Sequence, residues 1–284
     1  MQVAKTIQEV KAFVAEARVA GCRVGLVPTM GALHVGHVSL MQAAAARCDF
    51  VVVSIFVNPT QFGPGEDLEA YPRPFEKDVA ICKRHGVAVV FAPSPEEMYP
   101  LENVTWVTVE KLTEPLCGRS RPVHFRGVTT VCTKLFNIVG PDVAFFGQKD
   151  AQQALVIRRM VADLNMPLEI EVCPTVREAD GLAVSSRNRY LDARQRRDAT
   201  RLYRSLEKCR EMIEAGTTNV KEIRKTMVAI LQESPTLEVE YVSLVDAGNL
   251  QELTQVQGQV LVAIAVRVGP ARLIDNILVD TCIQ

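Results

Sequence analysis

The sequence has no long hydrophobic run. Its longest apolar stretches, residues 51–57 and 260–266, have the length of buried strands. A membrane-spanning helix needs roughly 18–20 apolar residues, so we expect no membrane partner. The first residues, MQVAK, lack the basic-then-apolar order of a secretory signal peptide. We therefore expect a cytoplasmic protein.

The sequence also lacks closely spaced cysteines and an excess of charge. Its eight cysteines stand at least fifteen residues apart, which leaves no CxxC pair and no zinc-ligand spacing. We interpret them as reduced, small core residues. The formal net charge of −1 argues against a protein that mainly binds polyanions. Asp192 and Asp198 interrupt the arginine cluster at 187–204, so we interpret it as a solvated helix face and expect no nucleic-acid partner.

The first part of the chain alternates between predicted strands and helices. At 284 residues and 48% hydrophobic side chains, the chain is long enough for about two domains. Strands are expected at 22–27, 50–57, 87–91, 143–146 and 168–173, and helices at 6–20, 37–47, 75–85, 128–139 and 150–164. Continuous apolar strands between helices predict an α/β fold, a Rossmann-like doubly wound parallel sheet.

The pattern changes near residue 180. Long amphipathic helices at 192–215 and 219–233 precede alternating strands at 237–245, 260–268 and 271–279. This order predicts a smaller C-terminal α+β domain with an antiparallel sheet. We expect domains at 1–176 and 177–284, with a hinge at about 177–190.

Residues 28–37 read PTMGALHVGH and lie between a predicted strand and a predicted helix. In open parallel sheets, ligands bind beyond the carboxyl ends of strands, where helix N-termini offer N–H groups. Gly31 and Gly36 allow close backbone approach to a phosphate, and His34 and His37 can donate hydrogen bonds to its oxygens. Paired histidines can also bind a metal, but no Cys, Asp or third His stands nearby in the sequence. The segment resembles the HxGH signature of the nucleotidyltransferase superfamily, in which such histidines contact ATP phosphates.

Two further segments fit a phosphate site. Residues 145–150, FFGQKD, end another predicted strand, where Lys149 can neutralise phosphate charge and Gly147 can admit a nucleotide. Residues 184–187, VSSR, supply two hydroxyls and a guanidinium that can clamp phosphate and close over it. Taken alone, the lysine also fits a solvated charge and the VSSR segment an ordinary polar linker.

Together with four more motifs, these segments resemble the pantothenate synthetase family in order and spacing. The additional motifs are VVVSIFVNPTQF at 51–62, YPR at 71–73, HFRGV at 124–128 and SSRNRYL at 185–191. The resemblance covers nearly the whole chain. It implies an enzyme that joins (R)-pantoate to β-alanine through a pantoyl-adenylate, converting ATP to AMP and pyrophosphate with Mg²⁺. It also implies a homodimer.

The resemblance further implies a set of site residues. The expected catalytic residues are His37, His34, Lys149 and Arg187. The expected ATP contacts are Met30, Gly31, Ala32, Leu33, His34, Val35, Gly36, His37, Gly147, Gln148, Lys149, Asp150, Val176, Val184, Ser185, Ser186 and Arg187. The expected substrate and metal contacts are Gln61 for pantoate and β-alanine, Gln153 for pantoate, Tyr71 near the amine site and Asp78 for magnesium.

The chain departs from the family pattern at two positions. Gln148 stands where many relatives carry Glu, and Val123 precedes His124 where Gly is common. Both positions bear on substrate preference rather than on the type of reaction.

Other functions share parts of this pattern. A nucleotidyltransferase that stops at nucleotide transfer would use the same HxGH element, and a catalytically silent ATP-binding module would keep the fold. A tRNA-charging synthetase is disfavoured because the chain has no KMSKS-type lysine loop and no anticodon-binding domain. A covalent acyl-enzyme is disfavoured because none of the four histidines has a nucleophile-elbow context.

Overall fold

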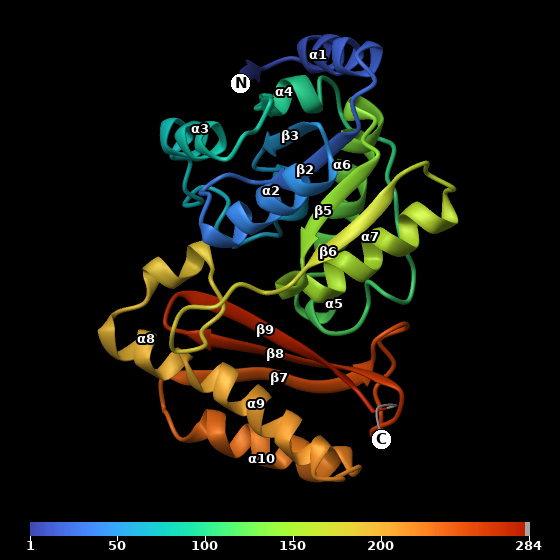
Figure 1. The fold of residues 1–284 in the computed structure, drawn as a ribbon. Helices are drawn as coiled ribbons and strands as arrows, with labels where there is room; N and C mark the ends of the chain where they lie inside the picture. Colours follow the sequence, from blue (N-terminus) through green and yellow to red (C-terminus); the bar gives the residue numbers. More distant parts are fainter. Residues whose placement is uncertain (282–284) are drawn as a thin grey trace. The chain divides into compact units, whose positions relative to one another are not determined.

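The computed structural model describes residues 1–281, which divide into two compact units (Figure 1). The first unit contains Met1–Glu114, Gly118–Gln148 and Gln153–Pro174. The second contains Pro115–Cys117, Lys149–Gln152 and the chain from Thr175 onward. The domain limits expected from the sequence, 1–176 and 177–284, stay a prediction, and residues 282–284 lie outside the described residues.

The first unit alternates strands with helices, as expected. Its elements are β1 (Gln2–Ala4), α1 (Ile7–Val19), β2 (Val24–Thr29), α2 (Val35–Arg47), β3 (Phe50–Ile55), η1 (Pro59–Gln61), α3 (Phe75–Arg84), β4 (Val89–Phe91), α4 (Pro95–Met98), α6 (His124–Val139), β5 (Val143–Gly147), α7 (Ala151–Asp163) and β6 (Glu169–Cys173). Three elements include residues of both units: α5 (Cys117–Ser120), η2 (Gln148–Asp150) and α7.

The strands of the first unit form a parallel sheet in the order β1-β4-β3-β2-β5-β6. The predicted doubly wound α/β fold is therefore confirmed. After β2 the chain adds β3 and β4 on one side and later returns to add β5 on the other, so the strand order reverses between β2 and β5. Gly25 pairs with Val143, and Leu26 pairs with Ala144. Ligands of doubly wound sheets bind outside the carboxyl ends of strands at such a topological switch point.

Successive strand residues of the first unit face opposite sides of the sheet. Leu26 and Val52 join a buried cluster with side chains of α1, α6 and α7. Their neighbours Val27 and Val53 join a second cluster with side chains of α2 and α3. The side-chain period of two residues explains why these strands are apolar throughout, since both faces are covered.

Two strands of the first unit differ from the prediction in ways that bear on the sheet. Strand β1 was missed because three residues show no periodic pattern; it pairs with β4 at the edge of the sheet. Strand β2 runs two residues further than expected, through Pro28, which lies opposite Ser54. Proline cannot donate to a ladder, but the pairing of β2 with β5 extends only as far as Leu26, so no donor is required of it there.

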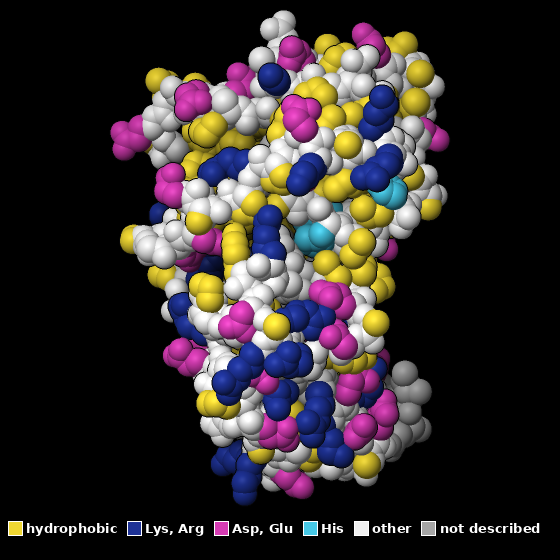
Figure 2. All heavy atoms as spheres, turned by 90° about the vertical axis from the view of Figure 1, so that its left-hand side faces the viewer, with side chains coloured by type: hydrophobic (Ala, Val, Ile, Leu, Met, Phe, Trp, Pro, Cys, Tyr) yellow, Lys and Arg dark blue, Asp and Glu magenta, His cyan; other side chains and the backbone are white. Residues whose placement is uncertain are grey.

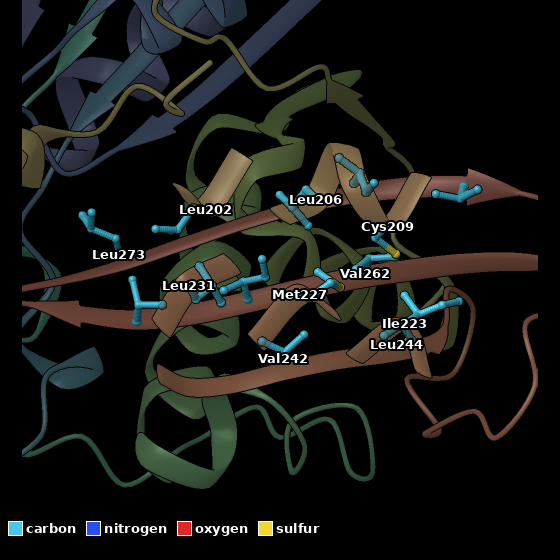
Figure 3. Packing of buried hydrophobic residues seen from close by; sticks show 14 of the residues in the cluster. Leu202, Leu206, Cys209, Ile223, Met227, Leu231, Val242, Leu244, Val262 and Leu273 are labelled. Atoms are coloured by element: carbon cyan, nitrogen blue, oxygen red, sulfur yellow. The ribbon is translucent and has the colours of Figure 1, made fainter. Parts of the chain in front are cut away.

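The second unit packs helices on an antiparallel sheet, as predicted. Its elements are η3 (Ser186–Tyr190), α8 (Ala193–Ala199), α9 (Arg201–Glu214), α10 (Val220–Gln232), β7 (Leu237–Asp246), β8 (Gln259–Val268) and β9 (Ala271–Asp280). The strand order is β7-β8-β9. Figure 3 shows the core, in which Leu206 of α9 and Met227 of α10 join Leu244 and Val262 of the sheet.

The prediction of a single helix at 192–215 is wrong. The chain forms two helices there, α8 and α9, with a break at Thr200. The N–H of Thr200 donates to the carbonyl of Arg197 at 3.3 Å, and its hydroxyl donates to the same carbonyl at 2.7 Å. A threonine hydroxyl that competes for backbone acceptors favours such a local turn over a continuous helix.

Candidate functional site

The turn after β2 carries the first group of predicted site residues and lies at the switch point. The hydroxyl of Thr29 donates to the carbonyl of Ser54 at 2.6 Å and accepts the N–H of Gly31 at 3.1 Å. Gly31 and Ala32 then adopt left-handed conformations, with φ of +82° and +50°. A left-handed conformation costs a residue with a Cβ roughly 1–2 kcal/mol, so Ala32 needs support from its surroundings.

Asp78 of α3 provides that support. Its Oδ2 accepts the N–H of Ala32 and its Oδ1 accepts the N–H of Leu33, both at 2.8 Å. The residue is only 1% exposed. The family resemblance implies that Asp78 binds magnesium, and that role stays a prediction. Within residues 1–281, no group of three or more His, Cys, Asp or Glu side chains is arranged to hold a metal.

The two histidines of the HxGH segment lie at the start of α2. The helix begins at Val35, two residues before the expected start, because His34 acts as its N-cap. The Nδ1 atom of His34 accepts the N–H of Gly36 at 3.2 Å, and Nδ1 of His37 accepts the N–H of His34 at 3.3 Å. A neutral imidazole that accepts at Nδ1 carries its proton on Nε2, so each ring has Nε2–H as its donor.

The two rings also pack together, with centroids 4.1 Å apart. A Cβ at Gly36 would lie 3.0 Å from the ring of His34, so a glycine lets that ring fold back over the helix start. The structure therefore brings His34 and His37 together at the free end of a 13-residue helix. Helix N-termini favour anions such as phosphate.

Gln61 lies close to this turn. Its Nε2 points to the sulfur of Met30 at 3.1 Å, while its Oε1 accepts from Nδ2 of Asn58 at 3.1 Å. Asn58 is 1% exposed, and its Oδ1 accepts from the hydroxyl of Tyr99 at 3.0 Å. This network fixes the Gln61 carboxamide with its oxygen toward Asn58. Asn58 is a site residue that was not predicted, although the asparagine–proline pair at 58–59 is a turn signal.

The backbone of Gln61 is held by the segment that precedes and begins α6. Its carbonyl accepts from Nδ1 of His124 at 3.0 Å and from Arg121 at 3.4 Å. Arg121 also forms a two-point ion pair with Glu66, at 2.8 and 2.6 Å. Burial alone would raise the pKa of Glu66, but the hydrogen bond and charge of Arg121 outweigh it and lower that pKa.

The remaining predicted residues of the first unit lie on neighbouring elements. Tyr71 is buried and meets Phe62 edge to face, with ring centroids 6.1 Å apart. Gly147 ends β5, the strand next to β2, and a Cβ added there would meet no described atom within 4 Å. Gln148 follows it, and Gln153 is half-buried in α7.

Lys149 and Asp150 belong to the second unit, within η2. The carbonyl of Lys149 accepts from Nδ2 of Asn276 of β9 at 2.9 Å. Asn276 is 5% exposed, whereas the lysine is half-buried and Asp150 is exposed. No local pattern marks Asn276, which lies 127 residues from Lys149 in the chain.

The predicted hinge residues form a short two-stranded turn. Val184 donates its N–H to the carbonyl of Val176 at 3.0 Å, so the structure brings these two residues together. The hydroxyl of Ser185 accepts the N–H of Arg187 at 3.3 Å and caps η3. Ser186 and Arg187 are half-buried.

A buried ion pair fixes the base of this turn. Arg177 donates to both carboxylate oxygens of Asp275, at 2.6 and 2.9 Å, and also to the carbonyl of Gly181. Its guanidinium stacks over the ring of Tyr203 at 4.2 Å. Neither Arg177 nor Asp275 stands out in the sequence, because no local pattern indicates that two charges 98 residues apart will pair.

The arginine cluster pairs with acidic side chains of the second unit. Arg196 contacts Glu178 and Asp180, and Arg201 contacts Asp198. Figure 2 shows Lys and Arg side chains interspersed with Asp and Glu over one face of this unit. This charge distribution fits the interpretation as a solvated helix face.

The seven cysteines within residues 1–281 form no disulfide, and six of them are buried. Burial raises the pKa of Cys82, Cys132 and Cys209 to about 12, which keeps these thiols protonated and unreactive. This agrees with their interpretation as core residues, whereas Cys282 lies outside the described residues.

Across the described part of the chain, no helix combines the length and apolar character that crossing a bilayer requires.

A doubly wound parallel sheet with an HxGH segment at its switch point defines a nucleotide-binding α/β protein of the HxGH type. Comparison with known proteins identifies the family. The model of the pantoate–β-alanine ligase family matches residues 2–278, and the chain belongs to this family.

Relatives named as members of this family match almost the whole chain. The chain is 57% identical to the pantothenate synthetase of Pelotomaculum thermopropionicum, over 97% of this chain and 98% of that one. The crystal structure of pantothenate synthetase from Thermus thermophilus superposes with a TM-score of 0.93 at 45% identity, covering 98% and 99% of the two chains. Pantoate–β-alanine ligase from Francisella tularensis, solved in complex with beta-gamma ATP and β-alanine, gives a TM-score of 0.80 at 33% identity, covering 98% and 97%.

Proposed function

We propose that this protein joins (R)-pantoate to β-alanine in an ATP-dependent reaction that releases AMP and pyrophosphate. The observation that carries the proposal is the HxGH segment at the switch point of a chain that matches the pantoate–β-alanine ligase family over residues 2–278. The Francisella relative was solved with beta-gamma ATP and β-alanine, which supports these two molecules as substrates here.

In this proposal, His34 and His37 bind the phosphates of ATP. Both rings accept backbone N–H groups at Nδ1, so Nε2–H is the donor that would meet a phosphate oxygen. The N-terminus of α2 adds the partial positive charge of the helix dipole. Backbone contacts from the rest of residues 30–37 complete this part of the nucleotide site.

Gln61 and Gln153 are the proposed pantoate contacts, and Gln61 also borders β-alanine. The oxygen of the Gln61 carboxamide accepts from Asn58 and one N–H points to the sulfur of Met30, which leaves the second N–H as a donor for a substrate. A pantoate hydroxyl or carboxylate oxygen can accept that bond. Tyr71, buried beside Phe62, is the further proposed contact near the amine site.

Further ATP contacts are proposed for residues that follow β5 and for residues of the second unit. They are Gly147, Gln148, Lys149, Asp150, Val176, Val184, Ser185, Ser186 and Arg187. Lys149 and Arg187 would stabilise charge on the phosphates during the reaction. Mg²⁺ is proposed to accompany ATP and neutralise phosphate charge.

The proposed chemistry proceeds through a mixed anhydride. The pantoate carboxylate attacks the α-phosphorus of ATP, and pyrophosphate leaves. The amine of β-alanine then attacks the acyl carbon of the pantoyl-adenylate, and AMP leaves as the amide forms. A carboxylate is a poor acyl donor without such a leaving group, and the phosphate-directed groups of this chain act by positioning and charge stabilisation.

We propose a cytoplasmic homodimer. The segment at residues 103–109, NVTWVTV, is rich in β-branched and aromatic residues. Some apolar side chains in this segment and just before it are exposed to solvent. Leu101 is 83% exposed, Val104 82% and Trp106 37%. Exposed apolar side chains this close together fit a surface that a second copy covers.

The test combines purified protein with ATP, Mg²⁺, pantoate and β-alanine, followed by mass detection of pantothenate and AMP. With ¹⁸O in the pantoate carboxylate, one label should appear in AMP, and pantoate alone should support pyrophosphate exchange into ATP. ADP as the product, or label in inorganic phosphate, would overturn the adenylate route. Release of an adenylated acid without amide formation would indicate a nucleotidyltransferase, and absence of any ATP conversion would indicate a silent binding module.

A further inference from the structure

The buried carboxylate of Asp78 touches the ATP-binding turn directly, and we infer that Asp78 is a positioning residue for that turn. It holds the backbone at residues 32–33 so that His34 caps α2 in the orientation that presents both histidines to phosphate. This inference rests on the proposed function, since it takes ATP as the ligand of residues 30–37.

The hydrogen bonds of Asp78 are arranged for a backbone turn. Each carboxylate oxygen accepts one N–H, from Ala32 and Leu33 respectively, at 2.8 Å. Hydrogen bonds to a charged acceptor are about twice as strong as neutral ones. Gly31, Ala32 and Leu33 are buried, so without Asp78 two backbone N–H groups would lose their acceptor away from water.

The turn needs this support because of its conformation. Gly31 and Ala32 both have positive φ, and the chain must then enter the helical region within three residues at Val35. The turn also packs tightly on the carboxylate, since a Cβ at Gly31 would lie 3.0 Å from Oδ2 of Asp78. The carboxylate therefore acts as a template for the turn, and the first exposed residues after it are those of the helix start.

This role differs from that of a magnesium ligand. Mg²⁺ demands octahedral geometry and usually keeps several waters, which requires open space beside its carboxylate. Asp78 is 1% exposed, and each of its oxygens already accepts a backbone N–H. We therefore assign Asp78 to the protein backbone rather than to the metal.

The experiment compares ATP binding to the wild-type protein and two variants by calorimetry, with Mg²⁺ and without the other substrates. Asp78→Asn places an NH₂ group opposite one of the two N–H donors and should weaken ATP binding about tenfold or more. Asp142→Asn is the matched control. Oδ2 of Asp142 also accepts a backbone N–H, that of Val24 at 2.6 Å, but at the opposite end of β2. This control should melt at a lower temperature and bind ATP with wild-type affinity.

The outcomes separate the inference from the proposed function. If the wild-type protein does not bind ATP, the proposed function fails. If the wild-type protein binds ATP, the inference is overturned by wild-type affinity in Asp78→Asn, by equal weakening in Asp142→Asn, or by recovery of Asp78→Asn at high Mg²⁺. Should Asp78→Asn fail to fold, Asp78→Glu keeps the charge but moves the carboxylate by one methylene away from its fit to the N–H groups of Ala32 and Leu33. That variant should weaken ATP binding several-fold whatever the Mg²⁺ concentration, and wild-type affinity or recovery at high Mg²⁺ overturns the inference.

Discussion

Two segments contain most of the proposed ATP contacts, residues 30–37 in the first unit and residues 176–187, with Val176 and residues 184–187, in the second. They are stabilised differently within their own units. In the first segment, backbone N–H groups donate buried hydrogen bonds to the side chains of Thr29 and Asp78. The second has one buried ion pair at its base, Arg177 with Asp275, and exposed ion pairs to Arg196 at its rim. Exposed pairs contribute little to stability, so the rim of the second segment can rearrange at small cost. The comparison supports a pre-formed phosphate site in the first unit and an adaptable segment in the second.

The largest effect should come from removing the buried base of the second segment. Asp275→Ala leaves the Arg177 guanidinium without its partner in a site where the carboxylate is 1% exposed. We expect the second unit to lose about 3–5 kcal/mol of unfolding free energy, measured by urea unfolding. The double variant that adds Arg177→Met should recover part of that loss, because no uncompensated charge remains buried. A loss of unfolding free energy below about 1 kcal/mol would show that the Arg177–Asp275 pair contributes no more than the exposed ion pairs of Arg196.

Lys149→Ala should have the next largest effect, on turnover rather than on stability. Loss of one preorganised charge in the transition state typically costs on the order of 10²-fold in kcat. The melting temperature should stay near that of the wild type, because the lysine side chain is half-buried and lies on a short turn. Lys208→Ala is the control, since Lys208 is an exposed lysine of α9 paired with Glu211. A folded Lys149→Ala enzyme with wild-type kcat would remove the residue from the active site.

Asn276→Ala should have a smaller effect of the same kind. Asn276 donates to the Lys149 carbonyl at 2.9 Å, so its loss should let the η2 turn shift. A net hydrogen bond of this type is worth about 1 kcal/mol, which corresponds to roughly fivefold in kcat. If Asn276 acts through Lys149, the double variant with Lys149→Ala should be no slower than Lys149→Ala alone. Additive losses in that cycle would contradict the coupling.

These sites show what the sequence could and could not predict. The fold class could be predicted because the strands are apolar throughout, as expected for strands buried on both faces of a sheet. The HVGH segment could be predicted as a ligand site because its glycine and histidines follow a predicted strand. Asp78 and Asn276 could not be found in this way, because their partners lie 45–46 and 127 residues away. Asp78 looks like an ordinary acidic residue in the first turn of a helix, where negative charge is common. Local patterns therefore predict the groups that would face a ligand, while the residues that orient them depend on tertiary contacts.

The smallest effect should come from the rim, through Asp180→Asn. A hydrogen bond from Arg196, at 2.8 Å, is the main reason that the pKa of Asp180 lies below its usual value of 3.8. A carboxyl whose pKa is lower in the folded state stabilises the protein above its unfolded pKa, and that contribution disappears as the pH falls through the folded value. Because the Asp180 side chain is 47% exposed, water screens the pair, and we expect less than about 1 kcal/mol at neutral pH. The difference in unfolding free energy between wild type and Asp180→Asn should therefore be small near pH 7 and should vanish as the solution is acidified below pH 3.8.

Salt near 1 M should also abolish this difference, since the Debye length is then about 3 Å. The loss of unfolding free energy in Asp275→Ala should persist in the same buffer. Equal salt sensitivity of the two variants would show that base and rim are stabilised in the same way.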